Sequence, residues 1–254
     1  MARLDFGGVS FEADLVAFDK DGTLLDFESM WGRLAEAWVA SLTSDEKDDA
    51  LARELFQSLG YDPDQGRTLS QSPLSIAKGE QLLAIAAGTL YRQGIPWPEA
   101  EDKAQEAFQH ASNELPLSRL VHPAGDVADL LSCLQRVGVR VAVVTTDDRT
   151  ETEEALQLMG ATPYVDCIVC GDDGFPSKPA PDMLVSICQR LQIEPSRTAV
   201  VGDTQADLLM AQRAGAGLRV AVLTGPADPE TLAAAADVII RSIDDISVIE
   251  DDLS

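Results

Sequence analysis

The chain has 254 residues, 45% of them hydrophobic, and its 43 acidic and 19 basic side chains give a formal net charge of −24. A chain of this length can bury a sizeable core, either as one large domain or as a domain that carries a smaller insertion. The negative charge excludes nucleic acid as a partner, because phosphate backbones attract clustered Lys and Arg side chains.

The N-terminal residues predict a hairpin followed by a buried strand. Leu4–Phe6 and Val9–Phe11 flank Gly7-Gly8, a pair that suits the two-residue turn between antiparallel strands. The apolar run Leu15–Phe18 comes next, and its four consecutive apolar residues are typical of a strand that is covered on both faces.

Two carboxylates follow this strand, in the segment Asp19-Lys20-Asp21-Gly22-Thr23. Residues i and i+2 of an extended chain face the same side, so both acids are predicted to lie in one loop. The Gly-Thr pair turns the backbone tightly and is expected to leave amide N–H groups free for an anion. The segment therefore predicts a site for phosphate and a cation, and a solvated Asp-Gly turn is the alternative interpretation.

The pattern becomes helical from about Glu28 to Arg119. Apolar residues recur there at helical spacing, as at Trp31, Leu34 and Trp38, and Pro or Gly marks the helix ends. We predict an all-helical insertion over residues 28–118, within a core formed by residues 1–27 and 119–254. An insertion beside the two acids is expected to close over the site and to recognise the leaving group.

Beyond Val121, short apolar strands alternate with helices. The predicted helices are Ala124–Val137, Glu151–Met159, Asp182–Leu191 and Ala206–Ala214, and the predicted strands are Arg140–Val144, Val165–Val169, Thr198–Val201, Arg219–Leu223 and Val238–Ile240. This alternation is typical of βαβ units. The fold class is therefore α/β, a Rossmann-like parallel sheet with an inserted helical cap, and the acidic tail Glu250-Asp251-Asp252 is expected to be a frayed end.

Polar residues follow three of the predicted strands. Ligands of open parallel sheets bind at the carboxyl ends of the strands, so these residues form one candidate site. Its members are Asp19 and Asp21 after the strand Leu15–Phe18, Thr145, Thr146 and Asp147 after Arg140–Val144, Lys178 in a proline-rich loop, and Asp203 with Asp207 after Thr198–Val201. Each has an ordinary structural explanation alone, such as a surface lysine or a helix N-cap, but together they suit one reaction.

The order of these elements resembles the haloacid dehalogenase superfamily of aspartate-nucleophile phosphotransferases, and most closely its phosphoglycolate-phosphatase-like branch with a helical cap. The resemblance covers Leu15–Asp26 and His122–Thr224. It implies that Asp19 is the nucleophile and Asp21 the general acid and base. It also implies that Thr145 and Lys178, with Thr146 beside them, bind the substrate phosphate. Mg²⁺ would be held by Asp19, Asp203 and Asp207, and by the backbone carbonyl of Asp21.

The chemistry is consistent with these roles. A carboxylate can attack phosphorus only if the repulsion between two anions is cancelled, and Mg²⁺ together with Lys178 would do so. Asp21 would protonate the departing alkoxide and then activate water. The predicted function is thus a Mg²⁺-dependent phosphatase acting on a small phosphorylated metabolite.

Two features depart from the family pattern. Lys20 stands between the two acids, where an apolar or neutral residue is frequent; by strand alternation we expect it to point away from Asp19, to pair with a surface acid and to carry little catalytic weight. Asp147-Asp148 follows Thr146 and adds negative charge near the phosphate pocket, which bears on phosphate affinity rather than on the reaction.

Other functions use related residues. A phosphosugar mutase would use the same nucleophile and return the phosphoryl group to the substrate. A 2-haloacid dehalogenase, a phosphorylated receiver and a non-catalytic binding protein fit less well, since the complete set of acids, lysine and helical insertion is present. Without an apolar run of roughly 20 residues or a signal peptide, and with cysteines in apolar segments, the sequence predicts a cytoplasmic protein without membrane contact, either a monomer or a homodimer.

Overall fold

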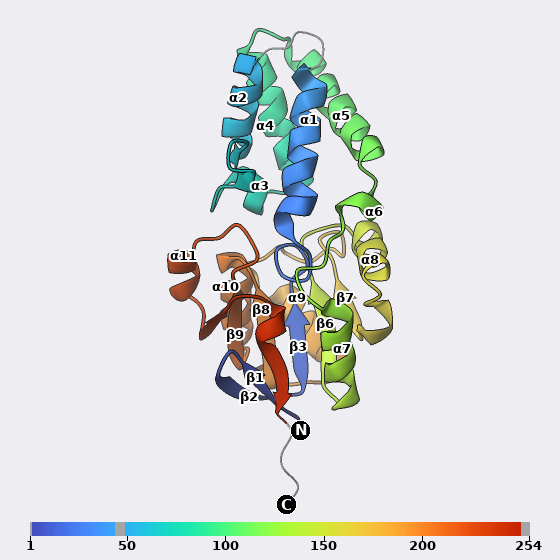
Figure 1. Ribbon diagram of the computed structural model, residues 1–254, viewed down its shortest axis with the longest axis vertical. Helices are drawn as coiled ribbons and strands as arrows, with labels where there is room; N and C mark the ends of the chain where they lie inside the picture. Colours follow the sequence, from blue (N-terminus) through green and yellow to red (C-terminus); the bar gives the residue numbers. More distant parts are fainter. Residues whose placement is uncertain (1, 44–48, 250–254) are drawn as a thin grey trace, which may run out of the picture. The chain divides into compact units, whose positions relative to one another are not determined.

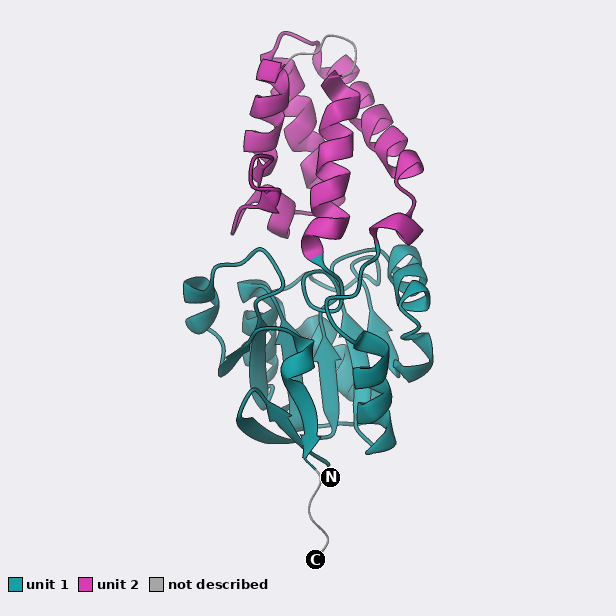
Figure 2. Cartoon of the chain, in the orientation of Figure 1, with its two compact units in different colours: residues 1–26, 121–254 teal, residues 27–120 magenta. Residues whose placement is uncertain are grey.

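The computed structural model describes residues 2–43 and 49–249 of the chain. It divides into two compact units, residues 1–26 with 121–254 and residues 27–120 (Figure 2). These boundaries adjoin the ones expected from the change in sequence pattern. The acidic tail Glu250-Asp251-Asp252 lies outside the described residues.

A six-stranded sheet forms the centre of the first unit, and all of its strand pairs are parallel. The order is β10-β9-β8-β3-β6-β7. The bounds are β3 Leu15–Phe18, β6 Arg140–Val144, β7 Cys167–Val169, β8 Thr198–Gly202, β9 Leu218–Val222 and β10 Val238–Ile240. The chain runs from β3 outward to β7 and then returns to β8 on the other side of β3. Rossmann-type sheets have this order, which confirms the predicted fold class, and ligands bind where the order reverses.

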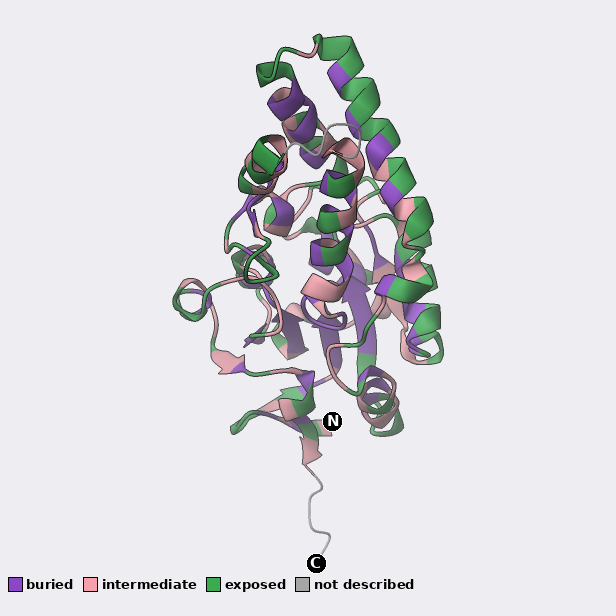
Figure 3. Ribbon diagram, turned by 45° about the horizontal axis from the view of Figure 1, so that its top comes forward, coloured by how far each residue is buried: buried purple, intermediate pink, exposed green. Residues whose placement is uncertain are grey.

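Helices cover both faces of this sheet (Figure 1). Leu15 and Ala17 of β3 pack in one cluster with apolar residues of α9 (Asp182–Leu191) and α10 (Gln205–Ala214). On the other face, α7 (Val127–Arg136) packs against β6. The central strands are buried along their length (Figure 3), as a sheet covered on both sides requires. Because these strands are packed on both sides, their ends can hold the side chains that follow them in fixed positions.

The predicted N-terminal hairpin is present as β1 (Ala2–Phe6) and β2 (Val9–Ala13), which are paired antiparallel. Gly7 and Gly8 have φ angles of 61° and 97°, a conformation that favours glycine. The strand β11 (Ile246–Ile249), which was not expected from the sequence, pairs with β1 to complete a separate three-stranded sheet. The remaining helices of this unit are α8 (Arg149–Leu158) and α11 (Pro229–Ala233).

The second unit is mainly helical. It contains the π-helical turn η1 Glu28–Gly32, the helices α1 Arg33–Thr43, α2 Asp49–Leu59, α3 Pro73–Ile76, α4 Gly79–Arg92, α5 Trp97–Glu114 and α6 Leu117–Leu120, and a small ladder of β4 Tyr61–Asp62 with β5 Arg67–Thr68. Strands of two residues show no periodicity, so the sequence did not indicate this ladder. Trp38 is buried in the core of the unit, and its indole N–H donates to the Ala104 carbonyl at 3.1 Å. Among the described helices, none is long and apolar enough for a membrane span.

Candidate active site

Asp19 and Asp203 follow neighbouring strands at the point where the strand order reverses. The backbone N–H of Asp19 donates to the Val201 carbonyl at 2.9 Å, which continues the pairing of β3 with β8 beyond the end of β3. Both side chains are buried, with 8% and 1% of their residues' surface exposed. The strand pairing therefore places two carboxylates side by side with little access to water.

Lys178 joins this pair of strand ends to the start of α10. Its Nζ lies 2.5 Å from Asp19 Oδ1 and 2.6 Å from Asp207 Oδ1. The lysine side chain is only 4% exposed. Burial alone would lower the pKa of Lys178, but the charges of Asp19 and Asp207 raise it above its ordinary value, so the lysine stays cationic. A fixed positive charge therefore lies against one oxygen of Asp19.

Asp207 is held on both of its oxygens. It is the third residue of α10, whose N-cap Thr204 accepts a hydrogen bond from the Asp207 N–H at 3.3 Å. In return Asp207 Oδ2 accepts from the Thr204 N–H at 3.1 Å, which completes a capping box. The other oxygen binds Lys178. The contacts of Asp207 thus fix the position of the lysine.

Asp203 contrasts with Asp207, because its buried Oδ2 has no hydrogen-bond partner among the described residues. Its Oδ1 accepts a long hydrogen bond of 3.4 Å from the Thr23 hydroxyl. A Cβ added to Gly22 or Gly225 would lie 2.4 or 1.8 Å from Asp203 Oδ2, so both glycines are needed to leave room around this oxygen. A buried carboxylate oxygen without a donor has a high energetic cost unless a cation or a proton satisfies it.

These acids fit a divalent cation. One ligand oxygen each from Asp19, Asp203 and Asp207 can be chosen so that all lie within 4.8 Å of one another. Mg²⁺ prefers carboxylate oxygens and keeps several waters or substrate oxygens, so one or two carboxylates suffice to hold it. The unpartnered Asp203 oxygen is the ligand atom that the protein has left available.

Asp21 forms a second cluster with Lys20 and Asp147. Lys20 Nζ lies 2.8 Å from Asp21 Oδ1 and 2.7 Å from Asp147 Oδ2, and the Lys20 side chain is fully buried. The expectation that Lys20 would pair with a surface acid is therefore wrong. Strand alternation does not apply to it, because β3 ends at Phe18 and the chain bends at Lys20. Asp147, expected to add charge to the phosphate pocket, is neutralised by this lysine.

Burial tends to raise the pKa of four acids in the site, and the neighbouring charges decide the net shift of each. It raises the pKa of Asp19 to about 6, although Lys178 opposes the shift. It raises the pKa of Asp21 to about 8, assisted by the charge of Asp147 and opposed by Lys20. It also raises the pKa of Asp203 well above the ordinary range. Burial would raise the pKa of Asp147 too, but the charge of Lys20 holds it low. Asp21 can therefore carry a proton near neutral pH while Asp147 stays ionised.

Thr145 lies buried at the end of β6, where its Oγ1 accepts a hydrogen bond from the Asp147 N–H at 3.2 Å. In the described part of the chain no group accepts a hydrogen bond from this hydroxyl, so it can donate to a substrate oxygen. Thr146 is exposed, and within the described residues no hydrogen bond joins its side chain to the acids. The amides of the Gly-Thr pair, expected to face an anion, are used internally: those of Gly22 and Thr23 donate to Leu25 O and Lys20 O at 2.7 and 3.4 Å.

Thr224-Gly225, which follows β9, was not among the predicted site residues. Thr224 Oγ1 donates to the Gly22 carbonyl at 2.6 Å, and Gly225 lies against Asp203. The strand-end rule that selected the other residues also applies to this strand and could have found the pair. These two residues hold the turn after Asp21 in place.

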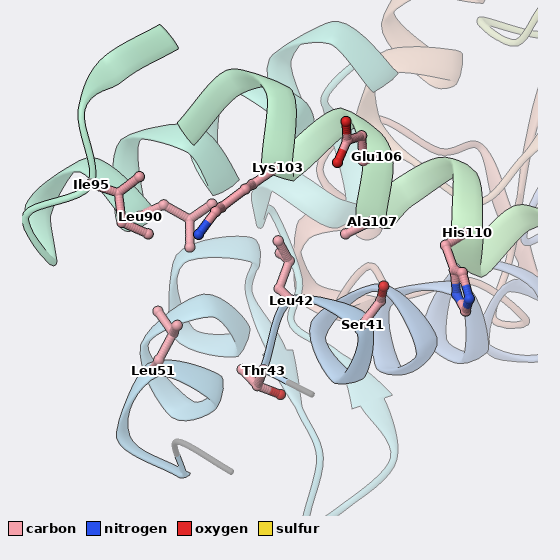
Figure 4. Close-up of a pocket in the computed structure, with 10 residues that line it drawn as sticks. All are labelled: Ser41, Leu42, Thr43, Leu51, Leu90, Ile95, Lys103, Glu106, Ala107 and His110. Carbon is pink, nitrogen blue, oxygen red and sulfur yellow. The ribbon is translucent and has the colours of Figure 1, made fainter. Parts of the chain in front are cut away.

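A separate cavity of about 420 Å³ lies within the second unit, between α1, α2, α4 and α5 (Figure 4). Its lining combines apolar side chains such as Leu42, Leu51 and Leu90 with Lys103 and His110. None of the strand-end acids lines it, so it is not part of the site described above.

The chain is similar to several known proteins. A family model described as haloacid dehalogenase-like hydrolase matches residues 13–215. Validoxylamine A 7'-phosphate phosphatase from Streptomyces hygroscopicus is 29% identical over 90% of this chain and 93% of its own length. Phosphoglycolate phosphatase 1 from Pseudomonas aeruginosa is 31% identical over 83% of this chain and 69% of its own length. A crystal structure described as a predicted phosphoglycolate phosphatase from Haemophilus somnus has a TM-score of 0.69 at 20% identity, and the match covers 92% of this chain and 96% of that chain.

Proposed function

This chain belongs to the haloacid dehalogenase-like hydrolases, and from that premise we propose that it is a Mg²⁺-dependent phosphatase of a small, phosphoglycolate-like phosphate monoester. The reaction would pass through an aspartyl-phosphate on Asp19. The observation that carries this proposal is the buried Asp19 carboxylate, held at Oδ1 by Lys178 beside an Asp203 oxygen for which residues 2–43 and 49–249 offer no hydrogen-bond partner. The names of the phosphatase relatives support a small phosphorylated substrate.

In the first step, a carboxylate oxygen of Asp19 attacks phosphorus and the ester oxygen departs. Lys178 orients the nucleophile through Oδ1, and its charge also attracts the transferring phosphoryl oxygens. The Thr145 hydroxyl donates to one of those oxygens, and Thr146 lies beside it at the outer edge. The fixed ammonium group of Lys178 stabilises negative charge as it develops in the transition state.

Asp21 moves the protons of both steps. With its pKa raised to about 8 it holds a proton that it gives to the departing alkoxide. The resulting carboxylate then accepts a proton from the water that hydrolyses the aspartyl-phosphate. A pKa close to the working pH allows one carboxyl group to serve as acid and then as base.

Asp19 and Asp203 would hold Mg²⁺ through carboxylate oxygens, and Asp21 would hold it through its backbone carbonyl. When bound, the ion would neutralise charge on the substrate phosphate. Asp207 completes the acidic set, and because both of its oxygens already have protein donors, it acts on this site through Lys178.

Without metal, the Tm should fall as the pH rises, and bound Mg²⁺ should oppose this fall. The folded protein holds protons on Asp19 and Asp21 more tightly than the unfolded chain does, because their pKa values of about 6 and 8 exceed the ordinary value. Their contribution is present at acidic pH and is lost as the pH rises. In EDTA we therefore expect the Tm to fall by roughly 5–10 °C between about pH 5 and about pH 8. Mg²⁺ should raise the Tm most at the higher pH, because binding displaces protons.

The variant Asp19→Asn is the control for this measurement, since it removes one titrating carboxyl while keeping its shape. Its Tm in EDTA should depend less on pH than that of the wild type and should be higher at about pH 8. A wild-type Tm that is constant over this range, or a Mg²⁺ effect that is independent of pH, would contradict the assigned titrations.

An assay of phosphate release tests the proposed function. The panel should contain phosphoglycolate, sugar phosphates, nucleotides and pyrophosphate, each with Mg²⁺ and with EDTA. We expect turnover of at least one small monoester that EDTA abolishes and added Mg²⁺ restores. Turnover that survives chelation, or no release from any ester, would contradict the proposal.

The same assay separates a phosphatase from a phosphosugar mutase. A mutase would move the phosphoryl group of a labelled sugar phosphate to another position without releasing phosphate.

The cytoplasmic location and the monomeric or homodimeric state stay predictions from the sequence.

A further inference from the structure

Lys20 is the most unusual residue of this protein's loop after β3. Its side chain is fully buried, although lysine is almost never found so unless it is paired. Its ammonium contacts Asp21 Oδ1 at 2.8 Å and Asp147 Oδ2 at 2.7 Å. Both acids share this one ammonium group. The three groups therefore form one closed cluster.

Stability does not explain this cluster. Removing an ammonium and two carboxylates from water is costly, and an apolar residue in place of a buried ion pair is often neutral or stabilising. The specific effect of the lysine is instead to fix one oxygen of Asp21.

Asp147 anchors the cluster to the rigid sheet. Its N–H donates to Thr145 Oγ1 at 3.2 Å, and its carbonyl accepts from the Gly171 N–H at 2.7 Å. Thr145 is the last buried residue at the end of β6 and a proposed phosphate ligand. Through Asp147 and Lys20, the position of the Asp21 carboxyl is thus linked to the residue that binds the transferring phosphoryl group.

We propose that Lys20 and Asp147 are a positioning pair, which holds the Asp21 carboxyl at the correct place to protonate the leaving group. This inference rests on the proposed phosphatase function. It explains both departures from the family pattern together, because Lys20 and Asp147 each balance the charge of the other. Neither residue touches the substrate in this assignment; both act through Asp21.

Two substrates with different leaving groups test the pair. An alkyl phosphate, 2-phosphoglycolate, needs its departing alkoxide to be protonated, whereas p-nitrophenyl phosphate releases a stable anion that needs little protonation. The ratio kcat/KM reports the steps through leaving-group departure, so later hydrolysis of the aspartyl-phosphate does not affect it. For Lys20→Met we expect kcat/KM to fall by about 100-fold with the alkyl ester and by less than about 5-fold with the aryl ester.

Four further measurements complete the design. Asp147→Asn, which is isosteric and less disruptive, should show the same selective loss to a smaller degree. The double variant K20M/D147N should lose no more than Lys20→Met alone, because both substitutions break one unit. Inhibition by inorganic phosphate should stay within about twofold of the wild type for both single variants. The exposed Lys103→Met, on α5, is the matched control and should change nothing.

The outcomes separate the inference from the function on which it rests. Equal losses with both esters in folded Lys20→Met and Asp147→Asn proteins would overturn the positioning role and leave the phosphatase function intact. Wild-type protein that hydrolyses neither ester, or Asp19→Asn protein that retains turnover, would instead overturn the phosphatase function. A selective loss with the alkyl ester in both variants supports the pair.

Discussion

Replacing Asp19 by asparagine is expected to lower kcat by about 10⁴-fold or more, because the amide keeps the shape of the side chain but cannot attack phosphorus. The contact with Lys178 would persist in weakened form, since the amide oxygen can still accept from Nζ. The fold should therefore be retained. The measurement is kcat on the best ester of the panel, together with circular dichroism and the Tm.

The exposed Asp129→Asn on α7 is the matched control, because it makes the same chemical change on the surface of the same unit. It should leave kcat unchanged. Mass spectrometry of acid-quenched wild-type enzyme should place the phosphoryl group on the peptide that contains Asp19. Retained turnover in Asp19→Asn, or a phosphoryl group on another peptide, would rule out the nucleophile assigned here.

The parallel sheet was predictable because its strands are short, apolar and bounded by polar residues. The predicted bounds of Arg140–Val144, Asp182–Leu191 and Val238–Ile240 agree with those of β6, α9 and β10. In the first unit, β11 and α11 were not predicted, because both are short and carry no strong periodicity. β11 forms only because β1 offers it an edge to pair with, which is a long-range effect that local sequence does not record.

The candidate site was predictable for the same reason. Parallel strands bring their carboxyl ends to one edge, so residues distant in sequence, such as Asp19, Thr145 and Asp203, could be grouped from the sequence pattern alone. The roles of individual acids were not predictable in this way. The free oxygen of Asp203 and the capped carboxylate of Asp207 differ in their hydrogen bonds, and these depend on helix α10 and on the loop of Gly225.

The direction of the Lys20 side chain could not be predicted from strand periodicity. The twofold alternation of a strand holds only while the backbone is extended, and the chain bends at Lys20, two residues after the end of β3. The side chain then turns inward between two acids, one of which comes from the end of another strand. A charged residue beside candidate catalytic acids should therefore be interpreted from the turn that follows the strand.

Replacing Lys178 by methionine is the second substitution with a large expected effect. The ammonium lies between Asp19 and Asp207, and its loss leaves these two carboxylates facing each other without a cation. We expect kcat/KM to fall by about 10³-fold, because the transferring oxygens lose a preorganised charge. In EDTA the free energy of unfolding should fall by about 3–5 kcal/mol, the usual cost of breaking a buried ion pair on one side. Steady-state kinetics, inhibition by inorganic phosphate and urea denaturation measure these effects.

The double variant K178M/D207N distinguishes charge balance from catalysis. Removing the Asp207 charge should recover part of the stability lost in Lys178→Met, because one of the two facing carboxylates becomes neutral and its Oδ2 side still accepts from the Thr204 N–H. It should recover no activity, since neither methionine nor asparagine offers a positive charge to the phosphoryl group. If activity returned together with stability, Lys178 would only balance charge, and another donor would have to bind the transferring oxygens.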